Sequence, residues 1–132
     1  MDKDSIMNIS KGIIEINEIE IKNTDTLTDV LTKTENQIKR ILNNNNLQLV
    51  YFENSLVCKY FTNCCLIFSE LGILKEVKMG FSMNDKNNYL KKPFIKFLRS
   101  QKCENNYVFE NGSIQLECEP HFMEYYIKIT YK

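Results

Sequence analysis

Short runs in which apolar and polar residues alternate recur along the chain, and they predict a protein built mainly of β-strands. The first runs lie on either side of Asn17-Glu18, where isoleucine and glutamate alternate over residues 14–16 and 19–21. A period of two places the apolar side chains on one side of a strand. Residues 14–21 are therefore predicted to form a hairpin of two short strands or a single bulged strand.

The same alternation continues through residues 47–81. Four runs can be distinguished, at 47–51, 57–61, 65–69 and 73–81. The candidate turns are Asn54-Ser55, Thr62-Asn63 and Leu71-Gly72. Strands this close in sequence are most easily paired antiparallel, because a parallel crossover needs about a dozen connecting residues. In such a strand Cys64 and Cys65 are expected to point to opposite faces of the sheet.

The C-terminal part of the chain predicts a further meander. Asn111-Gly112 suits a type I′ turn, which needs positive φ at both central residues, and it separates residues 107–109 from an alternating run at 114–118. A last strand is expected after Glu119-Pro120-His121. Its odd-numbered residues from 123 to 131 are predicted to face the core, and its even-numbered residues from 122 to 132 to face solvent.

Two segments carry apolar residues at helical spacing. Thr26-Leu-Thr-Asp29 resembles a capping box with Asp in place of Glu and predicts the start of a helix. The apolar positions that fit one face of this helix are Leu27, Val30, Leu31, Ile38, Ile41 and Leu42. Thr34 interrupts the stripe, so the helix is predicted to end between Lys33 and Asn43, ahead of a loop at 43–46. The second helix is predicted over roughly 90–101, with Pro93 in its first turn, where a missing N–H costs nothing.

These elements predict one α+β domain over residues 1–132, with a mainly antiparallel sheet and two helices packed on one face. A chain of 132 residues is long enough to bury a hydrophobic core without disulfides or metal. Five cysteines, an odd number without C-x-x-C spacing, predict reduced thiols and no metal site. No cofactor is expected, because Gly-rich phosphate loops and the common catalytic motifs are absent from the sequence.

The charge balance bears on the partner. There are 17 Lys and Arg against 17 Asp and Glu, which disfavours nucleic acid, because sequence-independent phosphate binding rests on excess positive charge. No stretch approaches the ~20 apolar residues that cross a bilayer, and the N-terminus shows no secretion signal. We therefore expect no membrane partner and a cytoplasmic location.

The sequence contains one candidate pair of residues for catalysis or ligand binding. Cys118 and His121 are the only thiol and imidazole close together, so an enzyme or ligand-binding domain that uses them is the alternative function. Cysteine nucleophiles usually meet their histidine through the fold, so the interpretation of a buried structural cysteine and an exposed turn histidine is favoured. The sequence thus favours a protein that binds a partner over one that catalyses a reaction.

Two groups of residues are candidate partner-binding surfaces. The first is an acidic set across the first strands and the start of the first helix: Glu15, Glu18, Glu20, Asp25 and Asp29. The second lies on the polar face of the last strand: Glu124, Tyr126 and Lys128. Complementary charge speeds association, and exposed Tyr is a common interface residue. Both sets also suit a solvated surface, and the oligomeric state is left open.

In the order of its elements, its size and its lack of a catalytic motif, the chain resembles the small cytosolic α+β proteins that serve as immunity partners of bacterial toxins. The resemblance covers the whole chain at the level of architecture. It implies a single-domain, non-enzymatic inhibitor that occupies the surface of a cognate toxin through a charged patch. A toxin that acts on nucleic acid would present a basic cleft, which the acidic set would complement.

Overall fold

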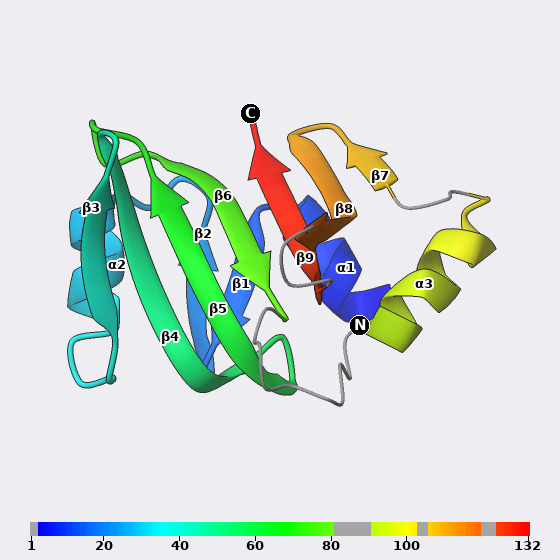
Figure 1. Ribbon diagram of the computed structural model, residues 1–132, viewed down its shortest axis with the longest axis horizontal. Helices are drawn as coiled ribbons and strands as arrows, with labels where there is room; N and C mark the ends of the chain where they lie inside the picture. The colour runs from blue at the N-terminus through cyan, green and yellow to red at the C-terminus, as the bar shows by residue number, and fades with distance from the viewer. Residues whose placement is uncertain (1–2, 81–90, 103–105, 120–123) are drawn as a thin grey trace.

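The computed structural model describes residues 3–80, 91–102, 106–119 and 124–132, with the backbone alone at 3, 91–93, 118–119 and 124–125 (Figure 1). The helices in these ranges are α1 (Lys3–Ser10), α2 (Leu27–Lys33) and α3 (Lys91–Ser100). The strands are β1 (Ile13–Ile16), β2 (Ile19–Lys22), β3 (Arg40–Asn44), β4 (Leu47–Val57), β5 (Tyr60–Phe68), β6 (Leu74–Met79), β7 (Asn106–Phe109), β8 (Gly112–Glu119) and β9 (Glu124–Tyr131).

All these strands belong to one antiparallel sheet, so the predicted α+β class is confirmed. The order is β2-β1-β4-β5-β6-β9-β8-β7, and β3 pairs with β4 outside this path. β4 is eleven residues long, and two different strands pair with it along the same edge. Its first half pairs with β3, and Val57 at its end pairs with Ile16 of β1, while β5 occupies the other edge.

A bulge lets β4 run through a segment where a turn was predicted. The register between β4 and β5 shifts between Phe52 and Ser55, and Asn54 has φ +46°. The backbone N–H of Asn54 donates to Oδ1 of Asn63 at 2.9 Å, which satisfies a donor that the bulge removes from the ladder. The predicted turns at Asn54-Ser55 and Thr62-Asn63 are therefore wrong, because the first is this bulge and the second lies inside β5.

Two-residue turns with positive φ at both positions close three hairpins, at Asn17-Glu18, Asn45-Asn46 and Cys58-Lys59. The predicted hairpin around Asn17-Glu18 is confirmed, whereas the predicted strand through 57–61 is wrong because it contains a turn. The predicted loop at 43–46 is half right, since Asn43 and Asn44 belong to β3. The predicted turn at Leu71-Gly72 is confirmed, with φ +79° at Gly72.

The C-terminal hairpin turns one residue earlier than predicted. Phe109 pairs with Gly112, so Glu110 and Asn111 form the turn. A Cβ on Gly112 would lie 1.9 Å from the carbonyl oxygen of Thr130 in β9. Gly112 is thus required by the close approach of the neighbouring strand, and the predicted role at a central turn position is wrong.

The first predicted helix is shorter than its apolar stripe suggested. The capping box is confirmed, with Thr26 and Asp29 each accepting from the other's backbone N–H, but α2 ends at Lys33. The buried hydroxyl of Thr34 donates to the carbonyl oxygen of Val30 at 2.8 Å beyond the last turn. Ile41 and Leu42 pair with Val50 and Leu49 in β3, so their assignment to the helix is wrong. The long strand β4 supplies partners that local periodicity cannot reveal.

Three helices of the described residues pack on the core, where two were predicted. The helix that the prediction missed is α1, whose Ile6 and Ile9 are fully buried with the core-facing residues of the sheet. The hydroxyl of Tyr131 in β9 donates to the carbonyl oxygen of Ile9 at 3.3 Å, which ties α1 to the far end of the chain. In the view of Figure 1, α1 and α2 lie behind the sheet and α3 lies beside the β7–β9 end.

The second predicted helix and the last strand are confirmed where they are described. α3 spans Lys91–Ser100, and Phe94, Phe97 and Leu98 are buried on its core-facing side. In β9 the alternation is as predicted, with Ile127, Ile129 and Tyr131 buried. Tyr126, Lys128 and Thr130 are half-buried on the other side. This sets up two faces of the sheet with different surroundings.

Candidate partner-binding surfaces

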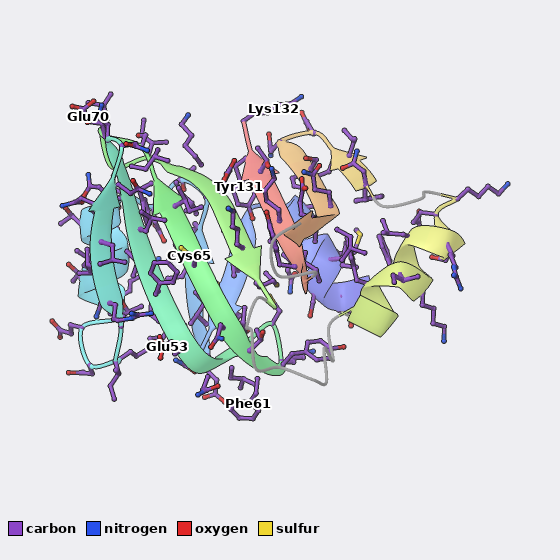
Figure 2. The ribbon with its side chains drawn as sticks, in the orientation of Figure 1. Glu53, Phe61, Cys65, Glu70, Tyr131 and Lys132 are labelled. Carbon is purple, nitrogen blue, oxygen red and sulfur yellow. The ribbon has the colours of Figure 1, made fainter. Side chains whose placement is uncertain are left out.

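One face of the sheet carries none of the three described helices, and we call it the helix-free face. Cross-strand pairing aligns a row of side chains across it: Arg40, Tyr51, Cys65, Lys78, Lys128 and Gln115. A second row, two residues along each strand, consists of Leu42, Leu49, Ile67, Glu76, Thr130 and Ser113. Figure 2 shows Cys65 near the middle of this face. The face therefore combines aromatic, apolar and charged groups over several strands.

Tyr126 and Lys128, two of the predicted contact residues, lie on this face. The ammonium of Lys78 is 5.3 Å from the ring centroid of Tyr126, a cation–π distance. Nζ of Lys128 is 3.4 Å from Oε1 of Glu117 on β8. The structure thus brings Tyr126 and Lys128 into one charged cluster that spans β6, β9 and β8. The third predicted residue, Glu124, has a described backbone at the start of β9, and its side chain lies outside the described set.

A second charged cluster lies at the β3 end of the same face. Arg40 is 2.7 Å from Oε1 of Glu53 through Nη2, and its guanidinium is 5.5 Å from the ring centroid of Tyr51. Both charged side chains are well exposed, so this ion pair adds little to stability. These two contacts hold the Arg40 side chain against β4.

The acidic set is divided by the fold. Glu15 and Glu20 are direct cross-strand partners in the β1–β2 hairpin, and Glu18 lies in the turn at φ +69°. Glu15 and Glu20 also line a pocket of about 60 Å³ together with Ser5, Asn8, Ile13, Cys58 and Lys59. Like charges directly opposite each other repel, so this pair is an unfavourable feature of the hairpin that a cationic partner would relieve.

Asp25 and Asp29 are both used by the fold. Oδ2 of Asp25 accepts from the backbone N–H of Lys22 at 2.9 Å and lies 2.6 Å from Nζ of Lys33. Oδ2 of Asp29 accepts from the N–H of Thr26 at 3.0 Å. The hydrogen bond from the Thr26 backbone lowers the pKa of Asp29, so its carboxylate stays ionised. These two carboxylates stabilise α2 and the segment that joins it to β2. Their role therefore differs from that of the hairpin glutamates.

Two of the described thiols, Cys64 and Cys65, are unsuited to nucleophilic chemistry. Cys58, Cys64 and Cys65 are buried, and Cys64 and Cys65 are free cysteines. Cys64 belongs to the core cluster, whereas Cys65 lies on the helix-free face, so the predicted opposite orientation is confirmed. Burial raises the pKa of Cys64 well above its usual range and that of Cys65 to about 11. These thiols are therefore protonated at neutral pH, while nucleophiles and metal ligands are thiolates.

The remaining chemical candidates fall outside what is described. The side chains of Cys103, Cys118 and His121 are not among the described residues, so the predicted Cys118–His121 alternative is not tested. No group of three or more metal-binding side chains occurs within residues 3–80, 91–102, 106–119 and 124–132. None of the described helices is long and apolar enough to cross a membrane.

The apolar edge at β3 was not predicted from the sequence. Leu42, Leu49 and Ile67 are cross-strand neighbours on the helix-free face, and Leu42 remains 48% exposed. Phe61, also on β5, is 74% exposed. Leu42 was overlooked because it had been assigned to a helix. The signal was the Asn45-Asn46 pair, since Asn tolerates the positive φ of a tight hairpin turn and alternating residues follow it.

Comparison with known proteins gives one relationship of fold. No protein-family model matches the chain, and no curated protein sequence matches it. Its fold is similar to that of a chain in the solved structure of "Rhs1-CT in complex with cognate immunity protein RhsI1". The TM-score is 0.55 over 92% of this chain and 83% of that chain, at 11% sequence identity. The chain is thus similar in architecture to a component of a toxin–immunity complex, as the resemblance drawn from its sequence implied.

Proposed function

We propose that this protein is a non-enzymatic inhibitor that binds a cognate toxin and blocks it by covering its surface. The observation that carries the proposal is the shared fold, over 92% of the chain, with a component of a toxin–immunity complex. The protonated state of the Cys64 and Cys65 thiols also favours binding over covalent chemistry. The free, buried Cys64 and Cys65 support a reducing compartment, so we place the inhibitor in the bacterial cytoplasm.

Two contact areas are proposed. The first is the acidic set, in which Glu15, Glu18 and Glu20 are available while Asp25 and Asp29 also act within the fold. A toxin that acts on nucleic acid would offer a basic cleft to these carboxylates. The second is the cluster around Tyr126 and Lys128, with Glu124 at the start of the same strand. A half-buried Tyr with a polar rim is a typical interface centre.

The test uses the protein encoded by the adjacent gene. Its C-terminal domain, which we call the candidate toxin, is expressed in a growing host with and without this chain. We expect growth arrest by the candidate toxin alone, rescue by coexpression, and copurification of the two proteins. Rescue without copurification, or no rescue at all, would contradict inhibition by surface binding.

Charge variants then distinguish the two contact areas. Replacing Glu15, Glu18 and Glu20 by Lys should weaken the complex and reduce its sensitivity to salt. A matched control reverses Lys96 and Arg99 of α3 to Glu, because both are exposed and lie far from the hairpin in sequence. The second area is tested by Tyr126→Ala and Lys128→Ala, with exposed Lys132→Ala, just beyond the end of the same strand, as the control. An area whose variants bind as tightly as wild type is removed from the proposal.

A further inference from the structure

β3 is an edge strand that is exposed along its full length. All five of its residues, Arg40–Asn44, are exposed, and among the described strands it pairs with β4 alone. An unpaired strand edge presents backbone donors and acceptors in the geometry that another strand would use. Natural proteins usually guard such an edge with charge, proline or a covering element.

The hairpin geometry identifies which groups point outward. Asn44 and Leu47 flank the two-residue turn, so they form a hydrogen-bonded pair. Hydrogen-bonded pairs alternate along an antiparallel ladder, so Leu42–Leu49 and Arg40–Tyr51 are hydrogen-bonded pairs as well. The N–H and C=O groups of Ile41 and Asn43 therefore point away from β4. Within the described residues, these four backbone groups have no hydrogen-bond partner.

The edge strand β2 differs from β3, because side chains form hydrogen bonds with its outward backbone groups. By the same geometry, the backbone N–H and C=O groups of Glu20 and Lys22 point outward from the β1–β2 hairpin. Nζ of Lys33 donates to the Glu20 carbonyl at 3.2 Å, and the N–H of Lys22 donates to Asp25 at 2.9 Å. Side chains thus cap β2, whereas no side chain of the described residues caps β3.

The side chains of β3 add apolar surface beside the free edge. Ile41 and Leu42 are each 48% exposed on opposite faces of the strand, and Leu47 across the turn is 42% exposed. The one charged residue, Arg40, lies at the far end and is already paired with Glu53. An edge that is apolar at its centre and free of charge repulsion suits a docked strand.

We propose that β3 receives an extended strand of the toxin, which pairs antiparallel or parallel with the outward groups of Ile41 and Asn43. The docked segment would carry apolar residues at alternate positions, next to Leu42 on the helix-free face. This inference rests on the proposed function, because it names where the toxin binds.

A second copy of this chain fits the edge less well. Self-pairing of a five-residue strand would engage two outward residues from each copy. A stable dimer needs an interface of about 1,000 Å² or more, which so short a pairing does not supply by itself. A larger partner can combine the strand pairing with contacts elsewhere on the helix-free face.

Amide hydrogen exchange on the complex with the candidate toxin tests the pairing directly. In the free protein the amides of Ile41 and Asn43 should exchange fast, and in the complex they should exchange at least about tenfold more slowly. The amides of Leu42 and Asn44 are the matched controls, because they point to β4 and are protected in both states. Fast exchange of Ile41 and Asn43 in a complex that forms and rescues growth would overturn this inference and leave the proposed function intact.

A proline variant provides the second test. Asn43→Pro removes an outward N–H and places a ring on the free edge, where proline is compatible with a strand. We expect it to weaken the complex about tenfold or more, while Asn43→Ala, which keeps the N–H, changes the Kd by less than about twofold. Equal binding of both variants would overturn the inference, and should Asn43→Pro fail to fold, the exchange result decides.

The remaining outcomes also discriminate. If the candidate toxin neither copurifies with the wild-type chain nor is neutralised by it, both the proposed function and this inference fail. If the purified chain alone is a dimer in which the Ile41 and Asn43 amides are protected, the edge belongs to a second copy and the docked-strand proposal is wrong.

Discussion

Tyr51 and Cys65 are direct partners across β4 and β5, and they face each other on the side of the sheet that carries no described helix. Burial raises the pKa of the Cys65 thiol to about 11, although a hydrogen bond from Tyr51 and the nearby charge of Lys78 act in the opposite direction. The pKa of Tyr51 is raised as well, first by burial and then by Cys65. Both groups are thus neutral at physiological pH and form a compact, uncharged centre between the two charged clusters of this face.

The first prediction concerns thiol reactivity. With a pKa of about 11, roughly one Cys65 thiol in ten thousand is ionised at pH 7. Alkylation of the native protein should therefore leave Cys64 and Cys65 unmodified on a timescale that labels a free cysteine peptide completely. Peptide mapping by mass spectrometry reads each position separately, and the denatured protein is the control for full labelling. Rapid native labelling of Cys65 would mean that this centre is open or ionised.

The second prediction concerns the capping box of α2. Thr26→Ala removes a side-chain acceptor from the first turn and should lower the free energy of unfolding by about 1 kcal/mol. Urea denaturation measures this difference. Thr28→Ala, at an exposed position within the same helix, is the matched control and should change stability far less. Equal effects would show that capping does not stabilise this helix.

The third prediction concerns the pH dependence of that cap. The pKa of Asp29 in the folded protein lies below its ordinary value of 3.8, chiefly because of the hydrogen bond from the Thr26 backbone. The ionised carboxylate therefore stabilises the fold above the unfolded pKa, and this contribution is lost as the pH falls through the folded pKa. Asp29→Asn should be less stable than wild type at pH 7, and the difference should shrink toward about pH 2.5. A constant difference across this range would assign the effect to packing.

The fourth prediction separates stability from binding at the acidic hairpin. Glu15 and Glu20 repel each other as a cross-strand pair, so Glu20→Lys should raise the free energy of unfolding by about 0.5 kcal/mol. Glu18→Lys makes the same change of charge in the turn, with no glutamate opposite it, and should have little effect on stability. Chemical denaturation measures both variants. Destabilisation by Glu20→Lys would mean that the glutamate pair is not repulsive in the folded state.

The fifth prediction concerns the packing of the last hairpin. Gly112→Ala would place a Cβ 1.9 Å from the carbonyl oxygen of Thr130, so β8 and β9 would have to separate. We expect a loss of about 3 kcal/mol in thermal or urea unfolding. Gly72→Ala is the control: its φ of +79° imposes backbone strain, but the nearest atoms are 3.7 Å away, so about 1 kcal/mol is expected. A smaller loss at Gly112 than at Gly72 would contradict the steric explanation.

Features that depend on residues close in sequence could be predicted. The capping box needs Thr26 and Asp29 alone, and the alternation in β9 follows from the period of a strand. The hairpin at Asn17-Glu18 has its two strands beside each other in the chain. Among the candidate contact residues, the placement of Tyr126 and Lys128 on a polar face followed from the same alternation.

The tertiary structure decided the features that depend on partners distant in sequence. Ile41 and Leu42 fit a helical stripe as well as a strand, and pairing with β4 settles the choice because it satisfies the backbone groups of Leu42 and covers Val50. Lys33 and Asp25 cap β2, whereas no described side chain caps the outer edge of β3. Local residue order determines which strands can form, whereas the register, the exposed edge and the division of the acidic set follow from which surfaces the folded chain covers.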